Sequence, residues 1–178
     1  MTAEDPVWIV SNLLLDCLQA QFTTGDPDLA TPVNFCWRSG EEISEDIDPW
    51  TGADLCCEGL GWVRVGNTFP SSNFPNPDEV SVKCLPTGWA QVFEVGLLGC
   101  YVPGGQEHMP TCAQHTTASV QDMARLRILK QALCCFDATD WITKRGRLWT
   151  IQSIEVSGPR SNCISRVATI LVNIPKCC

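Results

Sequence analysis

The chain has 178 residues, of which 44% are apolar, and its formal net charge is -8. This composition excludes a disordered chain, and the acidic balance argues against a nucleic-acid-binding protein, which is more often basic. No stretch approaches the roughly 18 apolar residues that span a bilayer, and the acidic start lacks the basic region of a secretion signal. We expect a single domain over residues 1–178, made in the cytoplasm and not bound to a membrane.

The charges are divided unevenly along the chain. Residues 1–58 contain twelve acidic residues and one basic residue, whereas residues 59–178 contain eight acidic and eleven basic residues. Such a division can orient contacts between identical subunits. The alternative is that the acidic stretch is a solvated loop, which is the more common role of a charge run.

The first predicted element is a helix that begins at Asp5, a typical N-cap residue, and continues from Pro6 for about four turns. Its apolar side is formed by Val10, Leu13, Leu14, Cys17 and Leu18. Residues 22–56 show no period and contain two turn signals. We therefore expect a long acidic loop there, and we interpret it as an interaction arm.

A short strand over residues 61–65 comes next, followed by a second exposed connection over residues 68–87 that is rich in proline. The strongest strand pattern lies at residues 89–101. Three of its side chains point to one face: Phe93, Val95 and Leu97. Within this strand, Gly96 and Gly99 predict a bulge or a close approach by another backbone.

A second helix is predicted over residues 118–136, with apolar residues almost all round it. Residues 148–156 and 166–172 alternate with period two, and residues 157–162 between them are typical of a hairpin loop. The element order α-β-β-α-β-β predicts an α+β fold. In the simplest packing, an antiparallel sheet of about four strands carries two helices on one face.

The sequence contains no catalytic signature, since it lacks a G-x-S-x-G elbow, an H-E-x-x-H helix, a phosphate loop and a dinucleotide fingerprint. We expect a protein that is not an enzyme and has no cofactor. His108, Cys112 and His115 place three possible metal ligands within eight residues, but their spacing matches no common zinc site. A polar loop is the preferred interpretation, and a metal site is the alternative.

Cysteines are frequent in this chain, which has 12 of them, three adjacent pairs and no C-x-x-C motif. The missing motif argues against a thiol redox enzyme. Adjacent residues point in different directions, so Cys134 and Cys135 should reach different partners. We expect a mixture of disulfides and buried thiols. The disulfide candidates are Cys36, Cys56, Cys57, Cys84, Cys100, Cys112, Cys134, Cys135, Cys163, Cys177 and Cys178.

Four segments resemble a known family: Cys56–Val65, Phe74–Pro77, Phe93–Cys100 and Gln121–Arg127. They are similar to segments of a cysteine-rich family encoded by actinobacterial, mycobacteriophage-like tailed phages. Members of that family lie in the head-to-tail region and are similar to tail terminator proteins of long-tailed phages. The likeness covers roughly residues 54–136 and, more weakly, the two C-terminal strands. The chain departs from the family near its C-terminus: where family members have a Gly-rich turn with Trp, this chain has Trp149 and the basic segment 144–147.

The resemblance implies a subunit of a ring, usually of six copies, in the neck of the virion. Such a ring caps the tail tube, stops its polymerisation and joins the tail to the connector on the head side. The implied fold is a small antiparallel sheet with two helices on one face. The implied partners are other copies of the chain, the tail tube protein and a head-completion or connector protein, while genomic DNA passes through the lumen without specific binding.

Within such a ring, the acidic part of one copy is expected to meet the basic part of the next. The interface candidates are Glu41, Glu42, Glu45, Asp46, Arg125, Arg127, Lys130, Lys144, Arg145 and Arg147. Disulfides would close after the particle leaves the reducing cytosol. The alternatives are a head-completion or connector subunit and, less in keeping with the segments, a disulfide-rich or metal-binding module.

Overall fold

The computed structural model describes residues 5–22, 29, 31–32, 34–38, 59–78, 88–100, 111–160 and 163–174. These residues form three helices and one five-stranded sheet with strand order β1-β2-β3-β5-β4. The elements are α1 (Pro6–Ala20), β1 (Asn34–Arg38), β2 (Leu60–Pro70), β3 (Trp89–Cys100), α3 (Cys112–Asp137), α4 (Asp140–Thr143), β4 (Trp149–Arg160) and β5 (Cys163–Ile174). The fold is of the α+β type, as predicted.

The sheet is mixed, and the predicted four-stranded antiparallel sheet is wrong in strand count and order. β1 pairs parallel with β2, whereas the other neighbouring strands pair antiparallel. β1 lies inside the loop expected at residues 22–56. Its sequence NFCWR has three apolar residues in a row between two polar ones, so it shows no alternation that would indicate a strand. β2 also extends to Pro70, well past the strand predicted at residues 61–65.

Helix α1 begins where the sequence predicts. Asp5 Oδ1 accepts a hydrogen bond from the backbone N–H of Val7 at 2.9 Å, and Pro6 occupies the first helical position. The cap satisfies one of the N–H groups that have no partner inside the helix. The side of α1 that packs on the sheet and α3 is the predicted apolar side, including the fully buried Val10 and Leu18.

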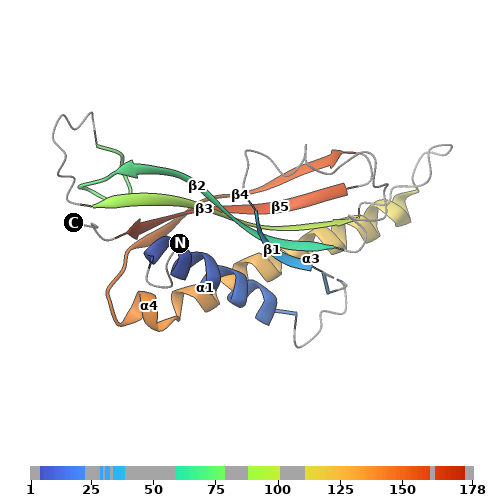
Figure 1. The fold of residues 1–178 in the computed structure, drawn as a ribbon. Coiled ribbons are helices and arrows are strands. Elements are labelled where there is room, and N and C mark those ends of the chain that lie inside the picture. Colours follow the sequence, from blue (N-terminus) through green and yellow to red (C-terminus); the bar gives the residue numbers. More distant parts are fainter. Residues whose placement is uncertain are drawn as a thin grey trace.

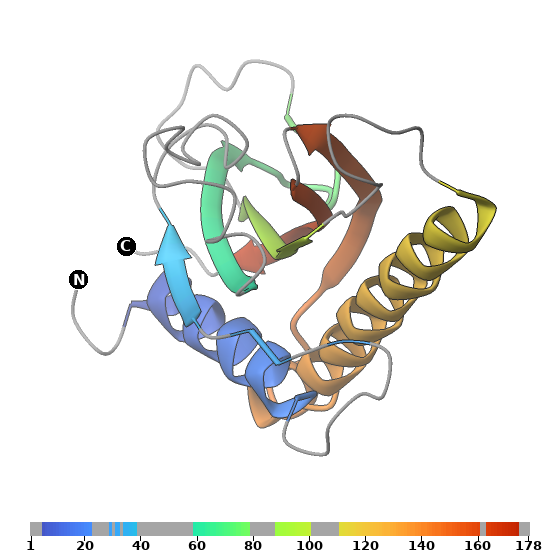
Figure 2. The same cartoon turned by 90° about the vertical axis from the view of Figure 1, so that its right-hand side faces the viewer.

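Both long helices lie on the same face of the sheet (Figure 1). The core between the two layers contains Leu14 and Leu18 from α1, Phe93, Val95 and Leu97 from β3, Leu129 and Phe136 from α3, and Ile170 and Val172 from β5. The predicted inward face of β3 is therefore confirmed. Figure 2 shows that α1 and α3 meet near their C-terminal ends and diverge toward their N-terminal ends.

The two glycines of β3 each leave room for a large side chain. A Cβ atom at Gly96 would lie 2.2 Å from the indole of Trp62, and one at Gly99 would lie 2.3 Å from the guanidinium of Arg125. The pairing of β3 with β5 is continuous, so the predicted bulge or backbone approach is wrong. Because the two glycines lie on opposite faces of the strand, Trp62 packs on the face away from the helices and Arg125 on the helical face.

Two other boundaries differ from the prediction. α3 begins at Cys112, inside the expected polar loop, because Thr111 and Gln114 form a capping box: the Gln114 N–H donates to Thr111 Oγ1 at 3.3 Å, and the Thr111 N–H donates to Gln114 Oε1 at 2.8 Å. β4 continues to Arg160, so residues 157–160 belong to the strand and not to the hairpin loop. The short helix α4 was also not predicted.

Candidate functional site

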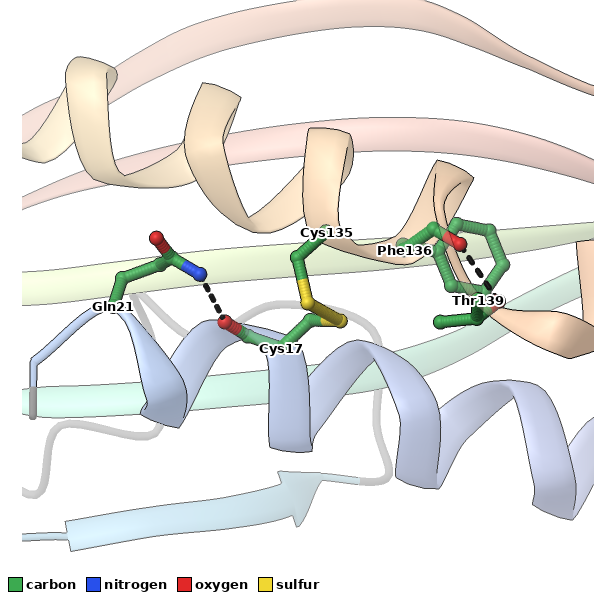
Figure 3. The surroundings of a disulfide bond; sticks show 5 residues. All are labelled: Cys17, Gln21, Cys135, Phe136 and Thr139. Atoms are coloured by element: carbon green, nitrogen blue, oxygen red, sulfur yellow. Dashed lines mark hydrogen bonds between the residues drawn. A yellow bond between two sulfur atoms is a disulfide. The ribbon is translucent and has the colours of Figure 1, made fainter.

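A disulfide bond joins the two long helices. It links Cys17 of α1 to Cys135 of α3, whose Cα atoms are 5.6 Å apart and which are separated by 118 positions in the sequence (Figure 3). Beside the bond, Gln21 Nε2 donates to the carbonyl of Cys17 at 3.0 Å, and Thr139 Oγ1 donates to the carbonyl of Phe136 at 2.7 Å. These side chains satisfy carbonyls in the last turns of both helices. The crosslink therefore joins the C-terminal parts of α1 and α3, where the two helices meet (Figure 2).

The neighbouring Cys134 takes no part in this bond. Its side chain is exposed and free, so Cys134 and Cys135 do not pair with each other, as predicted. Cys17 is absent from the predicted disulfide residues, and the sequence places it on the apolar side of α1. It is indeed buried, but it faces Cys135 across the contact between the helices. Local periodicity locates the buried side of α1 and does not identify the residue opposite.

The remaining cysteines fall into three groups. Cys100 and Cys163 are disulfide-bonded, as predicted. Cys36, Cys112 and Cys134 are free, contrary to the prediction. Two of these three are exposed on α3, outside the contact that brings Cys17 to Cys135. The other candidates lie outside the described residues: Cys56, Cys57, Cys84, Cys177 and Cys178.

Arg125 is buried inside the subunit. Its side chain packs over Gly99, and its Nη2 donates to the carbonyl of Cys100 at 3.2 Å. Burial lowers the pKa of the Arg125 guanidinium, while the carboxylate of Asp122 acts in the opposite direction. The prediction of Arg125 as an interface residue is wrong, because the side chain ties α3 to the end of β3.

A second contact ties the same part of α3 to β5. Arg166 Nε donates to Asp122 Oδ1 at 2.7 Å, and Arg166 Nη2 pairs with Oδ2. Bidentate pairs of this kind are stronger than single hydrogen bonds, and both side chains are largely buried. Because Arg125 also lies near Asp122, one carboxylate here offsets two guanidinium charges. Loss of the carboxylate would therefore leave two cations close together.

The basic turn after α4 is only partly available to a partner. Lys144 Nζ pairs with Asp140 Oδ2 at 2.7 Å, but both side chains are exposed, so the pair contributes only about 0.5 kcal/mol. The guanidinium of Arg147 lies over the ring of Trp141, with Cζ 5.3 Å from the ring centre. Burial, and then the charge of Arg145, lower the pKa of Arg147. Lys144 and Arg145 thus present their charges to solvent, whereas Arg147 is largely structural.

The other predicted charged residues divide by location. Arg127 and Lys130 are exposed on α3 and remain interface candidates. The acidic candidates, Glu41, Glu42, Glu45 and Asp46, lie outside the described residues. An acidic surface opposite these bases therefore stays a prediction.

The possible metal ligands that the structure describes lie in a helix and not in the predicted polar loop. Cys112 and His115 are exposed in the first turn of α3, while His108 lies outside the described residues. Among the residues that the structure describes, no three His, Cys, Asp or Glu side chains form a group able to hold a metal ion.

Exposed apolar side chains lie at both edges of the sheet, a feature that sequence periodicity did not reveal. On the edge strand β4, Ile151 is 44% exposed and Val156 is 43% exposed. On the other edge strand, β1, Trp37 is 41% exposed although its ring centre is 3.9 Å from that of Trp8. Open strand edges with apolar side chains are favourable places for contact with another chain.

No protein-family model matches the chain, and a search of curated proteins finds no match. Within the described residues, no helix is long and apolar enough to cross a membrane. The function is therefore inferred from the segments quoted above and from the geometry of the subunit.

Proposed function

We propose that the protein is a structural subunit of a phage virion, a tail terminator that forms a ring, usually of six copies, at the end of the tail tube. The ring stops polymerisation of the tube and joins the tail to a connector on the head side. Its partners are other copies of the chain, the tail tube protein and a head-completion or connector protein. It performs no catalytic step and needs no cofactor.

The observation that carries this proposal is that three of the four resembling segments interlock in space. Trp62 of β2 packs on Gly96 of β3, and Arg125 of α3 packs on Gly99 and donates to the carbonyl of Cys100. All five residues belong to segments that resemble the phage family. A glycine and the large side chain that occupies its space depend on each other. The resemblance therefore extends over one packed unit of sheet and helix, which supports a common fold.

The distribution of surfaces also supports a role in assembly. The helices cover one face of the sheet, while exposed apolar side chains remain at both sheet edges. The acidic first part and the mildly basic second part of the chain favour contacts between unlike surfaces of neighbouring copies. A net charge of -8 limits attraction to DNA phosphates, as passage of the genome through a lumen requires.

The disulfide between α1 and α3 is consistent with assembly of the particle inside the host and its later release. A chain assembled in the host cytoplasm keeps its thiols reduced, whereas the released particle meets an oxidising medium. The bond joins helices whose buried side chains already belong to one core. Its closure therefore reinforces a formed subunit in the finished virion.

Polymerisation of purified tail tube protein, with and without the chain, tests the proposal. We expect electron microscopy to show tubes that shorten as the ratio of chain to tube protein rises, each with a ring at one end. Unfolded chain at the same ratio is the control and should leave the length unchanged. Unchanged tubes with folded chain would contradict the proposal. Binding to a connector protein without an effect on tubes would assign the chain to head completion instead.

A further inference from the structure

We propose that neighbouring copies of the chain join head to tail through opposite edges of the sheet. The β4 edge comprises Arg145, Leu148, Ile151 and Val156. The β1–α1 edge comprises Trp8, Asp16 and Trp37. The β4 edge of one copy lies against the β1–α1 edge of the next. This inference deepens the proposed function and rests on it, because it names the surfaces through which a ring would close.

The β4 edge is a long strand border on which apolar side chains are exposed beside the polar Gln152 and Glu155. β4 has 12 residues and ends the strand order, so its outer side pairs with no other described strand. Ile151 and Val156 lie opposite Ile170 and Arg166 of β5, which places both on the helical face of the sheet. Leu148, just before the strand, is 58% exposed. Soluble proteins usually protect such a border with charges, and exposed apolar side chains that remain on it are suited to a partner.

The β1–α1 edge offers an aromatic surface of a different kind. β1 has only five residues, and its Trp37 packs edge-on against Trp8 of α1. Although its ring contacts Trp8, Trp37 is still partly exposed to solvent. Tryptophan is enriched among the residues that contribute most to protein–protein affinity. The helix that supplies Trp8 contains no basic residue, and its Asp16 is exposed.

Charge selects a second copy in the head-to-tail arrangement. Figure 2 places β1 and β4 at opposite edges of the sheet, with α1 near the first and α3 near the second. Lys144 is paired with Asp140, and the β4 edge begins at the exposed cation Arg145, whereas the exposed charge of α1 is the carboxylate of Asp16. Arg145 of one copy therefore attracts Asp16 of the next, and a closed ring needs two unlike surfaces on each copy. Each copy has one edge of each kind, so the contact repeats and closes a ring where the angle allows.

A lysine at the centre of the β4 edge tests the contact. Light scattering after size-exclusion chromatography should show that the full chain forms assemblies of more than two copies. Val156→Lys should lower the association constant by about tenfold or more, because an unpaired charge would be buried. Ile151→Lys should act in the same way. Gln131→Lys adds the same charge to the exposed side of α3 and should leave assembly unchanged, and circular dichroism checks that every variant folds.

Mixing variants decides between unlike and like edges. Trp37→Lys blocks the β1–α1 edge, so a mixture with Val156→Lys retains one good contact and should form dimers with one copy of each variant. Asp16→Lys replaces Trp37→Lys if the latter fails to fold. Dimers of Trp37→Lys alone would mean that two β4 edges pair, and would overturn the proposal. Normal assembly of Val156→Lys, or a wild-type chain that stays monomeric, would also overturn it.

The outcome is separable from that of the proposed function. If Val156→Lys assembles normally and still caps tail tubes, the edge contact is wrong and the terminator role stands. If the edges assemble as expected but the assemblies leave tube length unchanged, the terminator role fails and the contact stands.

Discussion

Replacement of both Cys17 and Cys135 by alanine would remove the bond between α1 and α3 without leaving a thiol able to pair with Cys134. The bonded residues are 118 positions apart in the sequence. For a loop of this length, the loss of chain entropy in the unfolded state is worth about 5 kcal/mol. Alanine also favours helix, and both helices bury core side chains around the bond, so the variant should still fold.

Urea unfolding under oxidising conditions measures the effect. We expect the free energy of unfolding to fall by about 3–5 kcal/mol. The dependence on urea should steepen, because the unlinked unfolded chain exposes more surface. Cys134→Ala is the matched control, since Cys134 adjoins the bond in the sequence but is exposed and free, and it should change stability by about 0.5 kcal/mol or less.

Two results would refute this reasoning. One is a loss below about 1 kcal/mol in the double variant, which is far less than loop closure predicts. The other is an equal loss in Cys134→Ala. In the presence of reductant, the wild-type chain and the double variant should unfold within about 1 kcal/mol of each other, because the bond is then open in both.

Two further predictions concern carboxylates. Asp122→Asn removes the partner of Arg166 and should lower the free energy of unfolding by about 2–3 kcal/mol, because two guanidinium groups are left largely buried. Asp140→Asn breaks an exposed pair and should lower the free energy of unfolding by about 0.5 kcal/mol or less. Thermal or urea unfolding measures both variants, and equal losses in Asp122→Asn and Asp140→Asn would contradict the role of burial. Asp78 Oδ1 accepts hydrogen bonds from the Oγ of Ser72 at 2.5 Å and from the N–H of Ser72 at 2.8 Å, which lower the pKa of Asp78 below its ordinary value. The ionised carboxylate stabilises this turn above the ordinary pKa, and the contribution is lost as the pH falls through the lowered pKa. NMR titration should show the pKa of Asp78 rising toward its ordinary value in Ser72→Ala, and an unchanged pKa would count against the hydrogen bond from Ser72 Oγ.

Some features of the site were within reach of sequence patterns. The start of α1 depends on Asp5 and Pro6, which act on backbone groups within the first turn. The N-terminus of α3 also has a local signal, because Thr111 and Gln114 have the spacing of a capping box. That signal identifies a helix start six residues earlier than the apolar period does. The separate orientations of Cys134 and Cys135 follow from helix geometry alone.

Other features have no local signal. β1 is a strand because β2 pairs with it, since the sequence NFCWR shows no apolar–polar alternation of its own. In the sequence, Arg125 is one of the basic residues that interrupt the apolar pattern of α3, so it is expected at the surface. It is buried because Gly99 leaves space for its side chain and the carbonyl of Cys100 accepts its hydrogen bond. The pairing of Cys17 depends on where α1 and α3 meet. These properties require contacts between segments far apart in the chain.

The sequence by itself determined the α+β class, the buried side of α1 and the inward face of β3, because periodicity and capping act between residues a few positions apart. Only the tertiary structure decided the parallel β1, the burial of Arg125, the bond between the helices and the exposed apolar edges. Each of these depends on which distant segments come together. Packing in the core sets that arrangement, and short-range patterns do not record it.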